Sequence, residues 1–256
     1  MMAGGLLLLH AFPVDARMWD RQRSEFTPSL PVVAPHMPGF GGTEPAGEVT
    51  SMRAAAERAL RELDRAGIDR AVVCGLSMGG YVAFELWRTA PELVAGLVLA
   101  NTRAGPDTDE GRASRRALAD RLRAEGSGFL VDDPPTLLSE SAPPELHAFV
   151  RGLIADQPAE AIAAASLGMA ERPDSTPDLV GIDVPTLVVT SSLDVLIPPE
   201  VSAPMASRIP GATLAVIQSV GHLSNLEAPD EFDRLLGEHL GRCDLQRPPG
   251  GPRRAP

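Results

Sequence analysis

Short apolar runs, largely uninterrupted by polar residues, recur along the chain and predict buried strands. They lie at Leu6–Leu9, Val32–Ala34, Ala71–Cys74, Val94–Ala100, Thr186–Thr190 and Ala212–Ile217. A strand with one wet face would alternate apolar and polar residues, so continuous runs indicate strands that are buried on both faces. The segments between them carry apolar residues at helical spacing, and the clearest, Met52–Ala66, ends at Gly67. Strands that alternate with helices predict an α/β fold, with a parallel sheet and helices on both of its faces.

The alternation stops between about residues 103 and 183, where no apolar run predicts a strand. Helical spacing instead covers Glu110–Glu125, Pro144–Asp156 and Pro158–Glu171, with proline-rich turns between them. This insertion is longer than an ordinary crossover, so we expect a helical cap over the carboxyl ends of the strands. The alternative is a set of packed helices with no role in substrate access. The predicted organisation is an α/β core in residues 1–102 and 184–242, a cap in residues 103–183 and a disordered tail in residues 243–256.

Composition and charge narrow the function classes. The 256 residues carry 34 acidic and 23 basic side chains, a net charge of −11, with no basic stripe that would neutralise nucleic-acid phosphates. The N-terminal leucine run is too short for a signal peptide, and no apolar stretch approaches the roughly 18 residues of a membrane span. The two cysteines lie in different settings and predict no disulfide. We therefore expect a soluble cytoplasmic protein with no membrane or nucleic-acid partner; a homo-oligomer is compatible with the sequence.

The pentapeptide GLSMG, Gly75–Gly79, joins a predicted strand to a predicted helix. Alone, a G-x-S-x-G match is weak, because chance supplies one in roughly one chain in seven of this composition. Its position between strand and helix is that of a nucleophile elbow, a tight turn that needs small flanking residues and holds the Ser77 hydroxyl clear of the sheet. The alternative is that Ser77 only punctuates a turn. Gly80 is expected to let the helix pack closely on the sheet.

A serine nucleophile needs a base and an acid that orients the base. Of the five histidines, only His222 lies on a loop after the last predicted strand. Asp194 directly follows the fifth strand, and the order Ser77, Asp194, His222 is that of the hydrolases with a nucleophile elbow. The alternatives are a loop histidine near a helix N-terminus and an aspartate in a turn. Asn101, after the fourth strand, occupies another place where such folds carry the acid, but an amide cannot serve. His10 is interpreted as a scaffold for its loop.

The remaining site predictions concern an oxyanion hole and a substrate pocket. The N–H of Met78, next to the nucleophile, and the N–H of Phe12, in the loop after the first strand, are the expected oxyanion donors. Arg103 is the one candidate for holding a substrate carboxylate, although a solvated arginine is the simpler interpretation. No metal ion or organic cofactor is required by this chemistry. Apolar side chains predicted to line an acyl or alcohol pocket are Leu196, Leu223, Phe129, Leu138 and Phe149.

Five motifs follow one another along residues 6 to about 240: LLLLHAFPVDARMWD, APHMPGFGGT, GLSMGG, SSLDVLIPP and GHLSNLEAPDEF. As a set they resemble serine hydrolases of the α/β-hydrolase superfamily, in the short, cap-bearing branch of 3-oxoadipate enol-lactonases, small esterases and cofactor-free haloperoxidases. The resemblance implies Ser77, Asp194 and His222 as the catalytic triad, with Phe12 and Met78 as oxyanion donors. It also implies a sheet of about six parallel strands, without the superfamily's first two antiparallel strands.

Two positions depart from the pattern of that branch. Ala11 stands where the branch usually has glycine, and if the position needed a positive φ, alanine would cost about 1 kcal/mol and shift the Phe12 amide. His36 stands where the branch usually has aspartate. The expected function is hydrolysis of a small carboxylic ester or lactone through an acyl-enzyme on Ser77. The alternatives are C–C bond hydrolysis, acyl transfer or perhydrolysis by the same triad, and ligand binding without catalysis.

Overall fold

Six strands, all parallel, form one sheet in residues 3–246, which the structure, a computed structural model, describes. Their order across the sheet is β2-β1-β3-β4-β5-β6. The predicted α/β fold with about six parallel strands is therefore confirmed. The strands are β1 (Ala3–Leu9), β2 (Val32–Val33), β3 (Ile68–Leu76), β4 (Val94–Ala100), β5 (Thr186–Ser191) and β6 (Thr213–Ile217).

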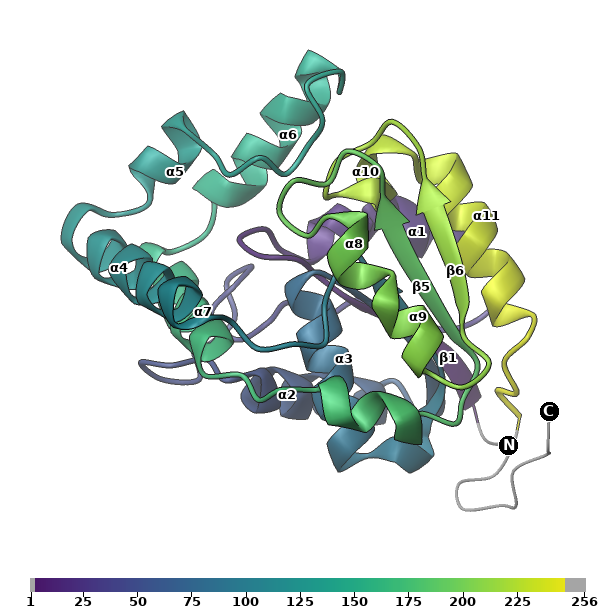
Figure 1. Ribbon diagram of the computed structural model, residues 1–256. Helices are drawn as coiled ribbons and strands as arrows, with labels where there is room; N and C mark the ends of the chain where they lie inside the picture. Colours follow the sequence, from purple (N-terminus) through teal and green to yellow (C-terminus); the bar gives the residue numbers. More distant parts are fainter. Residues whose placement is uncertain (1–2, 247–256) are drawn as a thin grey trace.

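Helices cover both faces of this sheet, as the alternating pattern predicts. In Figure 1, α8 and α9 lie on one side of β5 and β6, and α11 lies on the other. α2 and α3 pack against each other and β3, and α1 contacts α11. The core helices are α1 (Asp20–Phe26), α2 (Met52–Arg65), α3 (Met78–Thr89), α8 (Pro199–Ser202), α9 (Pro204–Arg208), α10 (Ser224–Glu227) and α11 (Pro229–Leu240), with short 3₁₀ helices at Ala16–Trp19 and Pro91–Leu93. A further 3₁₀ helix, Thr176–Gly181, lies between β4 and β5.

Burial follows the position of each strand in the sheet. Every residue of β4 and of β5 is buried, as their continuous apolar sequences predict. β6 is an edge strand, and its Leu214 and Val216 are exposed despite an equally apolar run. Periodicity alone cannot distinguish these two cases, because the exposure of β6 depends on where the strand lies in the sheet.

Four helices are inserted between β4 and β5: α4 (Asp109–Glu125), α5 (Gly128–Asp132), α6 (Pro144–Ala155) and α7 (Ala159–Ala170). Three of them match the predicted ranges to within one residue at each end, and the five-residue α5 was not predicted. α4 packs against α7, and α5 against α6. Figure 1 shows the four together at one end of the molecule, beside the sheet rather than stacked on its faces. We refer to residues 103–183 below as the inserted segment.

The C-terminal residues predicted as a disordered tail lie mostly outside the described range. Of those within it, Cys243 and Leu245 pack against the core, and the thiol of Cys243 donates to the carbonyl of His239 over 3.2 Å. Both cysteines are free thiols. No helix within residues 3–246 has the length and apolar character that crossing a membrane requires.

Candidate active site

Ser77 occupies a strained turn between β3 and α3. Its φ of 57° and ψ of −114° are unusual for a residue with a side chain, and its N–H is held by the carbonyl of Ala100 at 2.9 Å. The flanking glycines leave no room for a side chain: a Cβ on Gly75 would lie 2.2 Å from the Gly79 oxygen. A Cβ on Gly79 would lie 2.1 Å from the oxygen of Leu9. The chain therefore needs glycine at both positions to present Ser77 at the end of the strand.

Gly80 serves a related purpose one residue further along α3. A Cβ there would lie 2.4 Å from the hydroxyl oxygen of Thr102, the second residue after β4. Thr102 in turn donates its hydroxyl proton to the carbonyl of Ser77 over 2.8 Å. Gly80 thus allows the start of α3 to lie against the end of β4, which is the close packing predicted for it.

Asp194 and His222 meet at the carboxyl end of the sheet. Nδ1 of His222 lies 2.8 Å from Oδ2 of Asp194, and both side chains are almost completely buried. The other carboxylate oxygen, Oδ1, accepts from the N–H groups of Leu196 and Ile197, each at 2.9 Å. Burial would raise the pKa of Asp194, but the hydrogen bonds from His222, Ile197 and Asn101 outweigh it, so the pKa lies below its ordinary value. An ionised Asp194 can only accept, so Nδ1 of His222 carries the proton and Nε2 is left as a base.

Asn101 is part of the same network. Its side-chain nitrogen donates to Oδ2 of Asp194 and to the Ser191 hydroxyl, each over 2.9 Å, and its oxygen accepts from the Ser224 hydroxyl over 2.7 Å. The sequence placed Asn101 at the alternative position for the acid, after β4. Because β4 and β5 are neighbours, that position lies beside Asp194, and the amide supplies a donor where a second carboxylate would repel.

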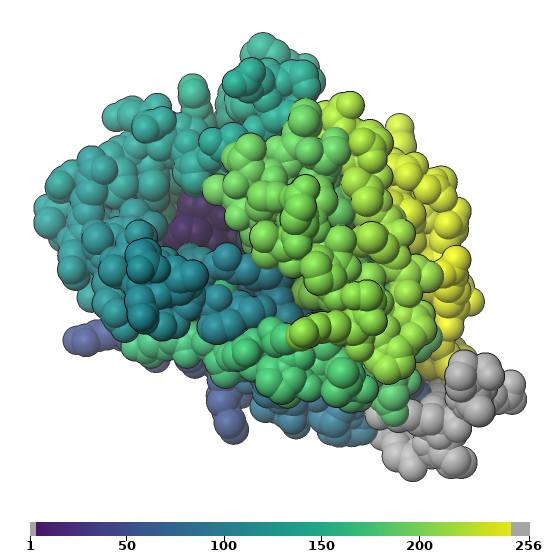
Figure 2. Space-filling model, in the orientation of Figure 1, coloured from purple at the N-terminus to yellow at the C-terminus, as the bar shows by residue number. Residues whose placement is uncertain are grey.

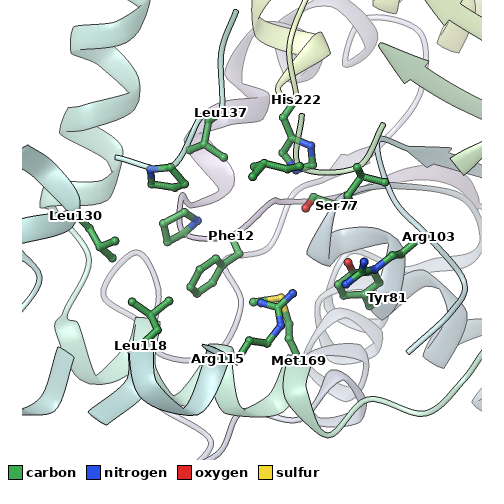
Figure 3. A pocket seen from close by; sticks show the side chains of 14 residues that line it. Phe12, Ser77, Tyr81, Arg103, Arg115, Leu118, Leu130, Leu137, Met169 and His222 are labelled. Atoms are coloured by element: carbon green, nitrogen blue, oxygen red, sulfur yellow. The ribbon is translucent and has the colours of Figure 1, made fainter. Parts of the chain in front are cut away.

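A cavity of about 250 Å³ opens beside these groups. Figure 2 shows it as a hollow between the inserted segment and the light-green C-terminal part of the core, with purple N-terminal residues at its floor. Ser77 and His222 both line it, and Figure 3 shows the serine oxygen and the imidazole on the same side of the hollow. No hydrogen bond joins the Ser77 hydroxyl to the His222 ring within residues 3–246; in structures without substrate such contacts are often long.

The predicted oxyanion donors also lie at this edge. β1 and β3 are neighbours, which brings the loop after β1 next to Ser77, and Phe12 lines the cavity. Met78 is the first residue of α3. Among the described residues, neither the Phe12 N–H nor the Met78 N–H is used in a hydrogen bond. Ala11 has a negative φ, so the alanine found in place of glycine adds no left-handed strain next to Phe12.

His10 and His36 support this loop. Nε2 of His10 accepts from the Met37 N–H and its Nδ1 donates to the Ala11 carbonyl, both over 2.9 Å, so the buried ring is held neutral. Burial lowers the pKa of His10 to about 4. His36 accepts from the Ala16 N–H over 3.3 Å and fills the space beside Gly41. Neither ring lines the cavity, and both act as structural partners of the loops after β1 and β2.

The cavity lining differs from the predicted one. Of the five apolar residues predicted for it, Leu196 lines the cavity. Leu223 and Leu138 belong to the core, and Phe149 is exposed on α6. The ring of Phe129 lies under the guanidinium of Arg121, whose central carbon is 3.7 Å from the centre of the ring. How the inserted segment docks decides which residues face inward, and sequence spacing does not fix docking. The apolar side chains that it contributes to the wall are Leu118, Leu130, Pro135, Leu137 and Met169.

Two arginines line the same wall, Arg103 and Arg115. Arg103 was singled out by its position after β4, and it is paired with the buried carboxylate of Asp107 rather than solvated. Arg115 lies on α4 and also contacts Asp107. Sequence reasoning missed Arg115, because several arginines lie on that helix and nothing local distinguishes the one that faces the cavity. Within residues 3–246, no group of His, Cys, Asp and Glu side chains is arranged to hold a metal ion.

Comparison with known proteins agrees with this geometry. A model of the alpha/beta hydrolase family matches residues 6–235, and the chain belongs to that family. A thermophilic esterase from Thermogutta terrifontis, solved with malate bound, is 40% identical with a TM-score of 0.89, over 94% of this chain and 90% of that one. The enol-lactonase of Burkholderia xenovorans LB400 is 26% identical with a TM-score of 0.85, over 94% of this chain and 92% of that one. The predicted resemblance to esterases and enol-lactonases is therefore confirmed.

The curated relatives differ more in activity than these two solved structures do. The pimeloyl-[acyl-carrier protein] methyl ester esterase of Aromatoleum aromaticum is 30% identical over 251 residues, which cover 90% of this chain and 96% of that protein. The dihydrolipoyllysine-residue acetyltransferase component of an acetoin cleaving system from Cupriavidus necator is 29% identical over 92% of this chain, which spans only 63% of that longer protein.

Proposed function

We propose that this chain hydrolyses a small carboxylic ester or lactone through an acyl-enzyme formed on Ser77. One observation carries the proposal. Ser77, held in a strained turn at the end of β3, and His222, whose ring is fixed by the buried Asp194, line the same cavity. The cavity, of about 250 Å³, is smaller than the roughly 300–1,000 Å³ of pockets for drug-sized ligands, which favours a small substrate.

The proposed reaction has two halves. Nε2 of His222 takes the hydroxyl proton as Oγ of Ser77 attacks the carbonyl carbon, and the developing oxyanion is held by the N–H groups of Phe12 and Met78. The imidazolium, stabilised by Asp194, then gives its proton to the departing alkoxide, which leaves an acyl-serine. In the second half His222 takes a proton from water, which attacks the acyl carbon, and the acid is released as Ser77 recovers its proton.

In this proposal the inserted segment acts as the cap. Its apolar side chains, among them Leu118, Leu130 and Leu137, form the wall opposite the core. They would exclude water and bind the hydrocarbon part of the acyl or alcohol group. The esterases and the enol-lactonase among the similar proteins support ester or lactone chemistry for this chain.

A panel of p-nitrophenyl esters and small lactones, measured with the wild type and with Ser77→Ala, tests the proposal. We expect the wild type to turn over at least one class and Ser77→Ala to lose several orders of magnitude in kcat. A fluorophosphonate probe should label the wild type and not the variant. Equal turnover by both proteins would exclude Ser77 as the nucleophile, and absence of labelling and turnover would favour a binding protein.

A further inference from the structure

Three arginines converge on one buried carboxylate just behind the wall of the cavity, which two of them line. The side chain of Asp107 is only 1% exposed and forms ion pairs with Arg103, Arg115 and Arg172. Burial would raise the pKa of Asp107, but the hydrogen bonds from Arg172 and Arg115 lower it to about 2, so it stays ionised at neutral pH. Three positive charges against one negative leave this group with an excess of two positive charges.

The surroundings do not cancel this excess. The cavity lining contains no aspartate or glutamate among the described residues. The chain as a whole carries a net charge of −11, so the positive wall is a local departure from the overall charge. A charge excess in a partly closed cavity acts more strongly than the same excess at an open surface, because less water screens it.

Arg172 and Arg115 differ in which of their guanidinium nitrogens already have hydrogen-bond partners. Arg172 is 3% exposed, donates to the carbonyls of Met169 and Gly105, and lies 4.1 Å over the ring of Tyr81, so it is a structural member of the group. Arg115 uses only Nε, toward Asp107. Its two terminal nitrogens make no hydrogen bond within residues 3–246, and Figure 3 shows them reaching toward the cavity from the side opposite His222.

Arg103 adds a second donor group from the same wall. One terminal nitrogen contacts Asp107, while its Nε is buried without a partner among the described residues. Its contact with one oxygen of Asp107 places it near Arg115, which contacts the other, and Figure 3 shows both side chains at the cavity. Asp107 therefore fixes two guanidinium groups at the cavity, and the terminal nitrogens of Arg115, which have no partner in the part of the chain that the structure describes, remain for an anion to bind. A planar fork of N–H donors matches the two oxygens of a carboxylate.

We propose that Arg115, assisted by Arg103, binds a free carboxylate on the substrate, so that the preferred substrates are esters or lactones that also carry an ionised acid group, such as half-esters of dicarboxylic acids. The inference rests on the proposed function, since the bound group is the non-reacting end of the molecule that Ser77 attacks. Asp107 acts through Arg115 and Arg103 by holding them in place, and Arg172 helps to fix Asp107.

Matched neutral and anionic substrates test this proposal. Monomethyl glutarate carries the carboxylate, and its carboxamide analogue, methyl 5-amino-5-oxopentanoate, has nearly the same shape without charge. Methanol release gives kcat/KM for each, and the succinate and adipate pairs probe the distance between the wall and Ser77. We expect the wild type to prefer the half-ester at least tenfold, the range of charge-assisted hydrogen bonds. Arg115→Met should bring the ratio close to one, mainly through KM.

Arg116→Met is the matched control, because Arg116 is exposed on the same helix and the substitution removes the same charge, but Arg116 does not line the cavity. It should keep the wild-type ratio. If Arg115→Met does not fold, Arg115→Lys, which keeps a charge beside Asp107 but loses the fork, should lower the ratio several-fold, as should Arg103→Met.

The outcomes separate the two proposals. A wild type that hydrolyses both esters with a ratio near one, or a soluble Arg115→Met variant that keeps the preference, overturns the carboxylate site and leaves the hydrolase proposal standing. No turnover of either ester, together with no turnover in the p-nitrophenyl ester and lactone panel, overturns both.

Discussion

Asn101 donates from its side-chain amide to Oδ2 of Asp194 over 2.9 Å, and the same oxygen lies 2.8 Å from Nδ1 of His222. One carboxylate oxygen thus holds both the proposed base and an amide from the neighbouring strand end. Since the amide is itself fixed by the hydroxyls of Ser191 and Ser224, it sets the position of Asp194 from the side of β4.

Replacing this amide by an apolar group of similar size should weaken catalysis without removing any group of the triad. A hydrogen bond to a buried charge contributes about 1.5–3 kcal/mol, so Asn101→Leu is expected to lower kcat/KM by roughly 10- to 100-fold. Ser224→Ala, which removes only the donor to the Asn101 oxygen, should have a smaller effect in the same direction. Wild-type kcat/KM in Asn101→Leu would show that Asp194 is positioned without it.

The glycines of the elbow give a second prediction. In Gly79→Ala the new methyl group would lie 2.1 Å from the backbone oxygen of Leu9. Neither backbone segment can move away without a large cost in free energy, so we expect a large loss of both stability and activity. Gly152→Ala is the control: Gly152 lies inside α6 with nothing within 4 Å of the added carbon. It should gain up to about 1 kcal/mol of stability through helix propensity. Thermal unfolding and ester turnover of both variants check this pair.

Glu227 joins the inserted segment to the loop that carries His222. Its carboxylate accepts from the Gly221 N–H over 2.8 Å and from both the N–H and the hydroxyl of Ser139. Glu227→Ala should free both loops, which we expect to appear as faster hydrogen exchange at Gly221 and Ser139 and as a roughly tenfold lower kcat/KM. Glu231→Ala, which breaks an exposed pair with Arg234, should change neither. Unchanged exchange in Glu227→Ala would show that the loops are held by other contacts.

Much of the fold and of the candidate site could be predicted because the relevant signals are local. Strand interiors, the elbow glycines around Ser77 and the positions of Asp194 and His222 just after strand ends are all visible in short windows. In a parallel sheet the carboxyl ends share one edge, so residues at those ends are brought together whatever the intervening sequence.

The substrate wall could not be predicted in this way. Which of the arginines on α4 faces the cavity, and why Phe149 does not, depends on how the inserted segment rotates and docks. Nothing local in the sequence distinguishes Asp107, and its function as the centre of an arginine cluster appears only when Arg115, on α4, and Arg172, just after α7, meet it in the fold. Such long-range contacts leave no periodic signal.

Two buried histidines make stability depend on pH. Burial lowers the pKa of His10 to about 4 and, with help from Arg242, that of His239 to about 4. Between about pH 6.5 and pH 4 the unfolded chain therefore binds protons that the folded chain does not, and the free energy of unfolding falls as the pH is lowered through this window. Each histidine accounts for about 3 kcal/mol of this loss, because one unit of pKa corresponds to about 1.4 kcal/mol.

His10→Gln isolates one of these contributions. Glutamine does not titrate and can still accept from the Met37 N–H, so the variant should start less stable at pH 7.5 but lose about half as much as the wild type on acidification to pH 4.5. Urea unfolding followed by tryptophan fluorescence at both pH values measures the difference. Below pH 4 both proteins should lose further stability. The pKa of Asp107 is lowered to about 2, so its stabilising negative charge is neutralised only in this more acidic range. If His10→Gln loses as much stability as the wild type between pH 7.5 and 4.5, protonation of His10 does not limit the acid stability of this fold.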